Sequence, residues 1–192
     1  NVKGIVANLH SDAAKTCVID VTGEASGAVE CRIAWDRRWR SMQTHTAEHI
    51  VSGIVHNLYG YENVGFHLGA DGAVVDFDGY LSPEQLADIE YRANSAVWAN
   101  VEIKTSFPAA EELKNISYRS KLDLTENVRI VEIVGYDRCA CCAPHVNQTG
   151  EIGIVKLTDS AKHRGGVRIR MLAGRDALND YRQKLSGTRA VS

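Results

Sequence analysis

Two pairs of metal-binding side chains, far apart along the chain, constrain its fold more than any other feature. His45 and His49 are four residues apart, so on an α-helix their imidazoles project from one face about one turn apart. Cys141 and His145 repeat this spacing downstream, where Pro144 disfavours a helix and predicts a loop. Zinc in proteins is held by such sets of histidine nitrogen and cysteine sulfur. We therefore predict that a helix and a distant loop meet at one zinc site.

The composition is that of a soluble globular domain. The 192 residues are 44% hydrophobic and 24% charged, which is enough for an independent core. The five cysteines are an odd number and three of them crowd into 139–142, a distribution that favours a metal over a disulfide framework. No apolar run is as long as a membrane span, and no signal-like leader opens the sequence. We expect a cytoplasmic protein that does not enter a membrane.

The charge pattern is neutral overall and basic in two places. The formal net charge of −2 gives no global attraction to nucleic acid. One basic group precedes the histidine helix, and the other lies in 156–175, where Asp159 is the single acidic residue. These groups are either solvated surface or a binding surface for a phosphate-bearing substrate. The candidate phosphate-binding residues are Arg37, Arg38, Lys156, Arg168 and Arg170.

The periodicity predicts an α+β fold with an antiparallel sheet and packed helices, preceded by a small β-barrel-like strand unit. The strands of that unit are predicted at 2–8, 16–22 and 28–34. Further strands are predicted at 65–69, 73–77, 101–107, 128–134, 151–157 and 167–172. Helices are predicted around His45 (ending at Gly60), at 82–99, at 108–114 and at 176–185. Ser82-Pro83-Glu84-Gln85 is a strong helix start, with a serine cap and glutamine three residues later.

These elements predict three segments. Residues 1–36 form an N-terminal β unit that we expect to be incomplete as it stands. Residues 37–176 form the domain that contains the zinc site, and residues 177–192 form a helical tail.

A competing motif overlaps the histidine pair. His45-Thr46-Ala47-Glu48-His49 matches H-x-x-E-H, a zinc-peptidase pattern in which the glutamate is a general base. Such a short pattern also arises by chance, and it leaves Cys141 and His145 without a role. Glu48 is therefore a candidate catalytic residue, with a solvent-facing or supporting carboxylate as the alternative.

Several motifs together resemble one family. They are the His45 and His49 pair, Cys141 with His145-Val146, Thr149-Gly150-Glu151-Ile152-Gly153, and Asn63-Val64-Gly65-Phe66-His67-Leu68-Gly69. In this combination the chain resembles the AlaX family, the free-standing relatives of the alanyl-tRNA synthetase editing domain, from about Ala34 to Tyr181. Threonyl-tRNA synthetases share a related domain. Where many relatives have Cys-Gly-Gly-Thr-His, this chain has Cys141-Cys142-Ala143-Pro144-His145.

The resemblance implies a zinc-dependent hydrolase that acts on tRNA. Its expected reaction is cleavage of the ester that joins a wrong amino acid, serine or glycine, to alanine tRNA. His67 is then expected at the pocket wall, and the two basic groups are expected to contact tRNA. Four protein ligands would close a tetrahedral zinc, which is typical of structural sites. A zinc peptidase using Glu48 and a non-catalytic tRNA-binding module with a structural zinc therefore remain as alternatives.

Overall fold

The chain divides into two compact units, Asn1–Ala34 and Trp35–Ser192. The computed structural model describes residues 6–11, 17–21, 32–120 and 127–191. In the first unit, β1 (Val6–Ser11) pairs with β2 (Cys17–Val21) in an antiparallel ladder. Of the third strand predicted there, at 28–34, residues 28–31 lie outside the described residues, and residues 32–34 are not in a strand.

The second unit is an α+β domain with two antiparallel sheets, which confirms the predicted fold class. Its elements are α1 (Trp35–Tyr59), β3 (Asn63–Gly69), β4 (Gly72–Phe77), α2 (Pro83–Ala99), β5 (Ile103–Ser106), α3 (Ala110–Leu113), β6 (Ile130–Ile133), β7 (Asp137–Ala140), η1 (Thr149–Ile152), β8 (Val155–His163), β9 (Gly166–Ala173) and α4 (Gly174–Val191). One sheet has the strand order β3-β4-β9-β8 and the other β5-β6-β7. Among the described residues, no helix is both long and apolar enough to cross a membrane.

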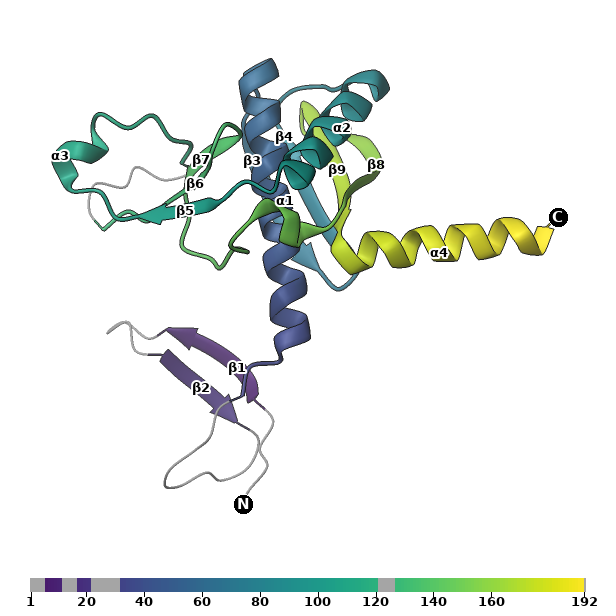
Figure 1. Cartoon of the computed structure of the whole chain (residues 1–192), viewed down its shortest axis with the longest axis horizontal. Coiled ribbons are helices and arrows are strands. Elements are labelled where there is room, and N and C mark those ends of the chain that lie inside the picture. The colour runs from purple at the N-terminus through teal and green to yellow at the C-terminus, as the bar shows by residue number, and fades with distance from the viewer. Residues whose placement is uncertain (1–5, 12–16, 22–31, 121–126, 192) are drawn as a thin grey trace. The chain divides into compact units, whose positions relative to one another are not determined.

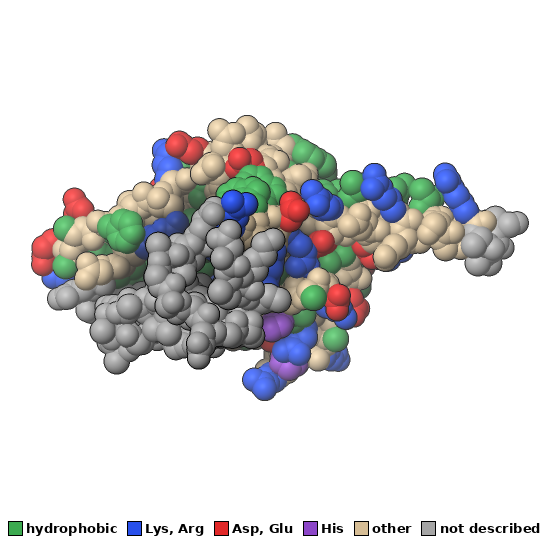
Figure 2. Space-filling view, turned by 90° about the horizontal axis from the view of Figure 1, so that it is seen from below, with side chains coloured by type: hydrophobic (Ala, Val, Ile, Leu, Met, Phe, Trp, Pro, Cys, Tyr) green, Lys and Arg blue, Asp and Glu red, His purple; other side chains and the backbone are tan. Residues whose placement is uncertain are grey.

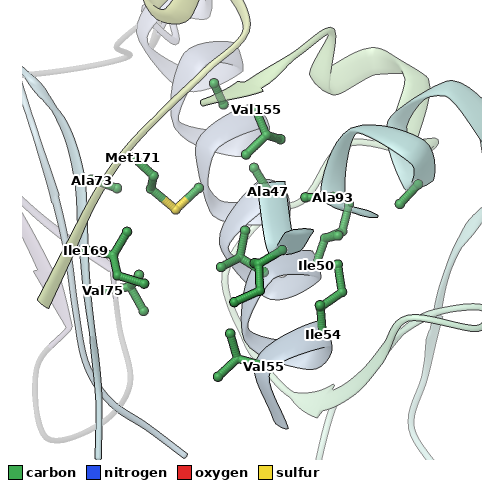
Figure 3. Packing of buried hydrophobic residues seen from close by; sticks show 14 of the residues in the cluster. Ala47, Ile50, Ile54, Val55, Ala73, Val75, Ala93, Val155, Ile169 and Met171 are labelled. Carbon is green, nitrogen blue, oxygen red and sulfur yellow. The ribbon is translucent and has the colours of Figure 1, made fainter. Parts of the chain in front are cut away.

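Helix α1 lies at the centre of this unit, between the two sheets (Figure 1). Its middle section, from Ala47 to Val55, is buried on every side. Figure 3 shows the side chains of this section facing those of β4 and β9, with α2 and β8 completing the core. Each fully buried aliphatic side chain of this kind contributes about 1.5–3 kcal/mol relative to exposure. The core therefore fixes which side of α1 is left for the histidines.

Local sequence signals explain the second helix. Ser82 is the N-cap of α2, and its hydroxyl accepts a hydrogen bond from the Gln85 backbone N–H at 3.2 Å. In turn, the Ser82 backbone N–H donates a hydrogen bond to the Gln85 side-chain oxygen at 2.7 Å. Asn100 ends the helix in the left-handed conformation, with φ of 50°. The predicted span 82–99 is confirmed to within one residue.

Three local predictions differ from the structure. The basic residues Arg37 and Arg38, expected to precede the histidine helix, are already helical, because α1 begins at Trp35. The strand predicted at 151–157 is divided between the 3₁₀ turn η1 and β8, which runs on to His163. The cysteine run was predicted as a loop, but its first residues belong to strand β7. The segment boundaries at 36 and 176 stay predictions; these positions lie within α1 and α4.

Gly53 permits a close approach between α1 and the turn that leads into β7. A Cβ atom at this position would lie 2.3 Å from the Tyr136 carbonyl oxygen and 2.8 Å from the Asp137 Cβ. Both distances are far shorter than van der Waals contact. The absence of a side chain at Gly53 therefore allows Asp137 to reach α1 next to His49, one helical turn away.

We predict that Gly53→Ala destabilises the protein and weakens its metal binding. Alanine normally stabilises a helix interior by about 0.5–1 kcal/mol relative to glycine, but here the added methyl group would push the β7 turn away. The matched control is Gly187→Ala in α4, where no atom lies within 4 Å of the added Cβ. Thermal unfolding of both variants should show a loss for Gly53→Ala and no loss for Gly187→Ala. Equal behaviour of the two would contradict the proposed close approach.

Candidate metal centre

The structure brings the four predicted ligands together. His45 and His49 come from α1, and Cys141 and His145 come from the loop that follows β7. One ligand atom from each of the four lies within 4.8 Å of those from the other three. The three imidazole rings are packed with centroids 4.2–4.9 Å apart. His49 and His145 are buried, and His45 and Cys141 are partly exposed.

Each histidine has one ring nitrogen held by a hydrogen-bond acceptor. His45 Nδ1 lies 3.2 Å from the Pro144 carbonyl oxygen, and His49 Nδ1 lies 2.9 Å from Asp137 Oδ2. Because these oxygens only accept, both histidines carry their proton on Nδ1. The Nε2 atoms of both rings are thereby left with a lone pair for a metal.

His145 is held in the same tautomer by a hydroxyl group. The Thr46 hydroxyl donates to the Met42 carbonyl oxygen at 2.8 Å, so its oxygen accepts from His145 Nδ1 at 3.1 Å. The Nε2 atom of His145 is buried and has no hydrogen-bond partner among the described residues. Such an atom is costly to bury unless something binds it. A metal ion would satisfy it.

The spacing of the ligands fits tetrahedral coordination. Cys141 Sγ lies 3.6 Å from His45 Nε2. Zinc binds sulfur at about 2.3 Å and nitrogen at about 2.0–2.1 Å, so two such ligands at a tetrahedral angle are about 3.6 Å apart. This pair is therefore at the separation that a shared zinc ion requires.

The charges around the cluster also fit a divalent ion. Burial disfavours the Cys141 thiolate, but the three surrounding histidines outweigh it and lower the pKa of Cys141 to about 3. Counting this thiolate with the carboxylates of Asp137 and Glu48, and the guanidinium of Arg119, the centre has two uncompensated negative charges. Burial opposes the charge on His49 as well, yet the hydrogen bond to Asp137 and the nearby anions raise the pKa of His49 to about 9. Protonation of His49 would balance one of these two negative charges, whereas a metal dication would balance both.

Asp137 and Arg119 form a buried ion pair behind His49. The Asp137 side chain is 1% exposed, and its two oxygens accept from Arg119 Nε at 2.7 Å and Nη2 at 2.9 Å. Cys139 lies near His49 and Asp137 in a second group of possible ligands. Burial raises the pKa of Cys139 to about 12, so its thiol stays protonated and is the weaker ligand. Cys139 is not one of the four clustered ligands, although it lies close by.

Glu48 is a buried carboxylate with partners of its own. It is 5% exposed, and its Oε1 accepts from the Ser52 hydroxyl at 2.5 Å and from the Asn63 amide at 2.6 Å. The Asn63 side chain in turn accepts from the Gly65 backbone N–H at 3.1 Å. Glu48 thus connects α1 to β3 and is not one of the four clustered ligands.

The structure does not bring His67 to the metal cluster. Phe66 stacks on His45, with ring centroids 5.8 Å apart, so Phe66 faces α1. Successive residues of a strand point to opposite faces, which places His67 on the other face of the sheet. His67 is exposed there. The preceding residue, Phe66, is the one that forms a wall of the cluster.

The structure places the predicted phosphate-binding residues on several different elements. Arg170 is registered with Val74, which is registered with His67, so Arg170 lies on the sheet face away from α1. Arg168 is on that face too, in a two-bond ion pair with Asp76 at 2.7 Å. Lys156 pairs with Glu90 at 2.7 Å.

Arg37 and Arg38 lie in the first turns of α1, so the basic residues do not form one group. Figure 2 shows Lys and Arg side chains in separate places among acidic ones, with histidine beside one of the basic groups.

Sequence reasoning missed the residues that support the ligands. Asp137, Thr46 and Arg129 each hold a ligand or its loop, but none has a spacing that distinguishes it from other residues of its type. Arg119 lies in Tyr118-Arg119-Ser120-Lys121, a segment that resembles the AlaX family. The resemblance points to this segment but does not indicate that Arg119 pairs with Asp137.

Comparisons with known proteins agree with this site. Residues 128–170, which include Cys141 and His145, match the family described as the threonyl and alanyl tRNA synthetase second additional domain. The chain is 35% identical over 162 residues to an alanine–tRNA ligase of Hyperthermus butylicus, a match that covers 80% of this chain and 17% of that protein. It is 30% identical over 135 residues to the alanyl-tRNA editing protein Aarsd1-A of Xenopus laevis, covering 68% of this chain and 33% of that protein.

The segment that carries Cys141 and His145 thus matches a domain family named for threonyl and alanyl tRNA synthetases. The chain is a member of the alanyl-tRNA editing family, as its motifs predicted. It spans about a third or less of the length of the relatives just described.

We predict that Asp137→Asn weakens metal binding by about 10–100-fold, because outer partners of ligating histidines contribute on that scale. The variant removes the charge that orients His49 and leaves Arg119 without its carboxylate. Cys139→Ala is the matched control, since Cys139 belongs to the same group as His49 and Asp137 but is protonated. Zinc affinity, measured by competition with a chromophoric chelator, should fall in the first variant and stay near wild type in the second. A loss in Cys139→Ala of the same size would mean that the second group binds the ion.

Proposed function

We propose that this chain is a zinc-dependent aminoacyl-tRNA hydrolase. It cleaves the ester between alanine tRNA and a wrongly attached amino acid, serine or glycine, and so serves the fidelity of translation. The observation that carries the proposal is the convergence of His45, His49, Cys141 and His145 in a chain whose relatives include alanyl-tRNA editing proteins. The domain that performs the reaction is proposed to span 37–176, with 177–192 as a helical tail.

The chain's own residues prepare the centre for this reaction. Zinc there would supply Lewis acidity, which polarises an ester carbonyl and makes water more acidic. Asp137, Thr46 and the Pro144 carbonyl oxygen each hold a proton on one histidine Nδ1, so every Nε2 would be available to bind the ion. Phe66 covers one face of His45 and excludes water from that side. The centre is therefore preorganised, and little rearrangement is needed when substrate arrives.

The geometry of Glu48 argues against the peptidase alternative. A general base must be within hydrogen-bond reach of the water it activates. Glu48 Oε1 is already occupied by Ser52 and Asn63, and the side chain is buried. We propose instead that Glu48 supports the site by joining α1 to β3. Its negative charge adds to the demand for a cation at the cluster.

A non-catalytic tRNA-binding module with a structural zinc is the second candidate function. The specific observation in its favour is that four protein side chains converge, because four ligands leave a tetrahedral zinc no open position. Hydrolysis requires either that one ligand be displaced or that the zinc accept a fifth ligand. His45 and Cys141 are the partly exposed members of the set, so the substrate would approach from their side.

We predict that the zinc-loaded protein releases serine from serine-charged alanine tRNA much faster than alanine from correctly charged tRNA. Release of labelled amino acid over time measures both rates. Binding of the two tRNAs without faster release of serine would favour the non-catalytic module.

Two variants assign the chemistry within the same assay. Cys141→Ala should lose zinc and nearly all activity. Glu48→Gln keeps an Oε1 that can accept from Ser52 and Asn63, so zinc should be retained and activity should fall only modestly. If Glu48 were the general base, its loss would cost about 10²–10⁴-fold. An inactive, zinc-loaded Glu48→Gln would overturn our assignment.

The tRNA contacts are proposed for Arg37, Arg38, Lys156, Arg168 and Arg170. The structure ranks them, because Arg168 and Lys156 already have carboxylate partners. Arg37, Arg38 and Arg170 have no carboxylate partner among the described residues, and a cation without such a partner loses less when it binds a phosphate. Arg170 is therefore the strongest candidate on β9.

We predict that Arg170→Ala weakens tRNA binding and lowers its salt dependence by the equivalent of one phosphate contact. Loss of one contact reduces the slope of log affinity against log salt by about 0.9. Arg92→Ala is the control, because Arg92 is an exposed arginine on α2 that pairs with Asp88. Titrations at several salt concentrations measure the slope. An unchanged slope in Arg170→Ala would make these basic residues ordinary solvated surface.

A further inference from the structure

Arg129 is attached directly to the loop that carries two of the ligands. Its Nη1 donates to the carbonyl oxygens of Cys141 and Ala143, both at 2.9 Å. The Cys141 backbone N–H donates back to the Arg129 carbonyl oxygen at 3.0 Å. The guanidinium is therefore hydrogen-bonded to the backbone of the same residue whose sulfur is a candidate ligand. It lies at the edge of the metal cluster, on the side of the partly exposed Cys141.

The positive charge of Arg129 is not neutralised by a carboxylate among the described residues. Its neighbours are different: Arg119 pairs with Asp137, and Arg138 pairs with Glu132. Arg129 instead binds two neutral carbonyl groups through a single nitrogen. Its Nε and Nη2 hydrogens have no partner in the described part of the chain, although a guanidinium offers five N–H donors.

We propose that Arg129 binds the phosphate of the nucleotide whose ribose carries the scissile ester. This inference rests on the proposed function, since it requires that ester to lie at the metal cluster. The phosphate of that nucleotide is separated from the ester by one ribose. Arg129 is likewise close to the candidate ligand Cys141, because it binds the carbonyl oxygen of that residue. A guanidinium presents a planar pair of donors that matches two phosphate oxygens. Arg129 thus both holds the ligand loop and positions the end of the RNA.

The test is a double-mutant cycle between the protein and the RNA. The probe is an uncharged acceptor-stem hairpin of alanine tRNA with its single-stranded 3′ end. The last internucleotide phosphate is either normal or replaced by a neutral methylphosphonate. Affinity is measured with zinc-saturated wild type, Arg129→Gln and the control Arg138→Gln. Arg138 is matched because it is an arginine of the neighbouring strand β7 that already has a carboxylate partner.

We expect the methylphosphonate to weaken binding by about tenfold in wild type, the scale of one charge-assisted hydrogen bond. In Arg129→Gln the same replacement should have almost no effect, while Arg138→Gln should retain the full tenfold loss. An equal loss in all three proteins would overturn the inference and leave the proposed function intact. If wild type does not bind the normal hairpin, the proposed function itself fails.

Arg129→Lys separates phosphate binding from support of the loop. Lysine keeps the positive charge but cannot span the two carbonyl groups as arginine does. It should therefore retain part of the coupling to the phosphate, even where zinc affinity falls. If the lysine and glutamine variants lose zinc equally and neither changes the effect of the methylphosphonate from the wild-type value, Arg129 only supports the loop.

Discussion

The hydrogen bond between His49 and Asp137 joins segments that are 88 residues apart and fixes the geometry of the metal centre. It requires that the turn before β7 approach α1 closely, which Gly53 allows. It also requires a partner for the second oxygen of Asp137, which Arg119 provides. Because the carboxylate and the guanidinium are both nearly excluded from water, loss of either one leaves a buried charge without compensation. The centre is therefore a network and not four separate ligands.

The surroundings of the cluster are selective in charge as well as in shape. Three neutral imidazoles and one thiolate can bind several ions, and geometry alone distinguishes them poorly. Together with this thiolate, the two carboxylates and the single guanidinium near the ligands leave two negative charges, which a dication balances. A monovalent ion would leave one negative charge in a region where charge is expensive. Electrostatics and spacing thus favour the same occupant.

Much of the fold and the ligand set could be predicted, because the relevant signals are local. Ser82 and Gln85 define the start of α2 by direct hydrogen bonds, and the four-residue spacing of His45 and His49 places both on one helix face. Asp137 could not be identified, because it is one of 24 acidic residues and its role arises from a tertiary contact.

His67 was expected at the pocket wall, but strand alternation gives that place to Phe66. The sequence contains the alternation, yet only the packing of α1 shows which of the two faces is inside.

The ligands are far apart along the chain, and this affects how the protein is made. Cys141 lies 96 positions after His45, and His145 then completes the set. Chains are synthesised at about 5–20 residues per second, so roughly 5–20 s pass between the two. Through this interval the nascent α1 has a pair of imidazoles but no thiolate, and none of the β7 contacts that orient His49. A metal ion can be retained firmly only after the chain has been made through His145, which makes metal capture a late step of maturation.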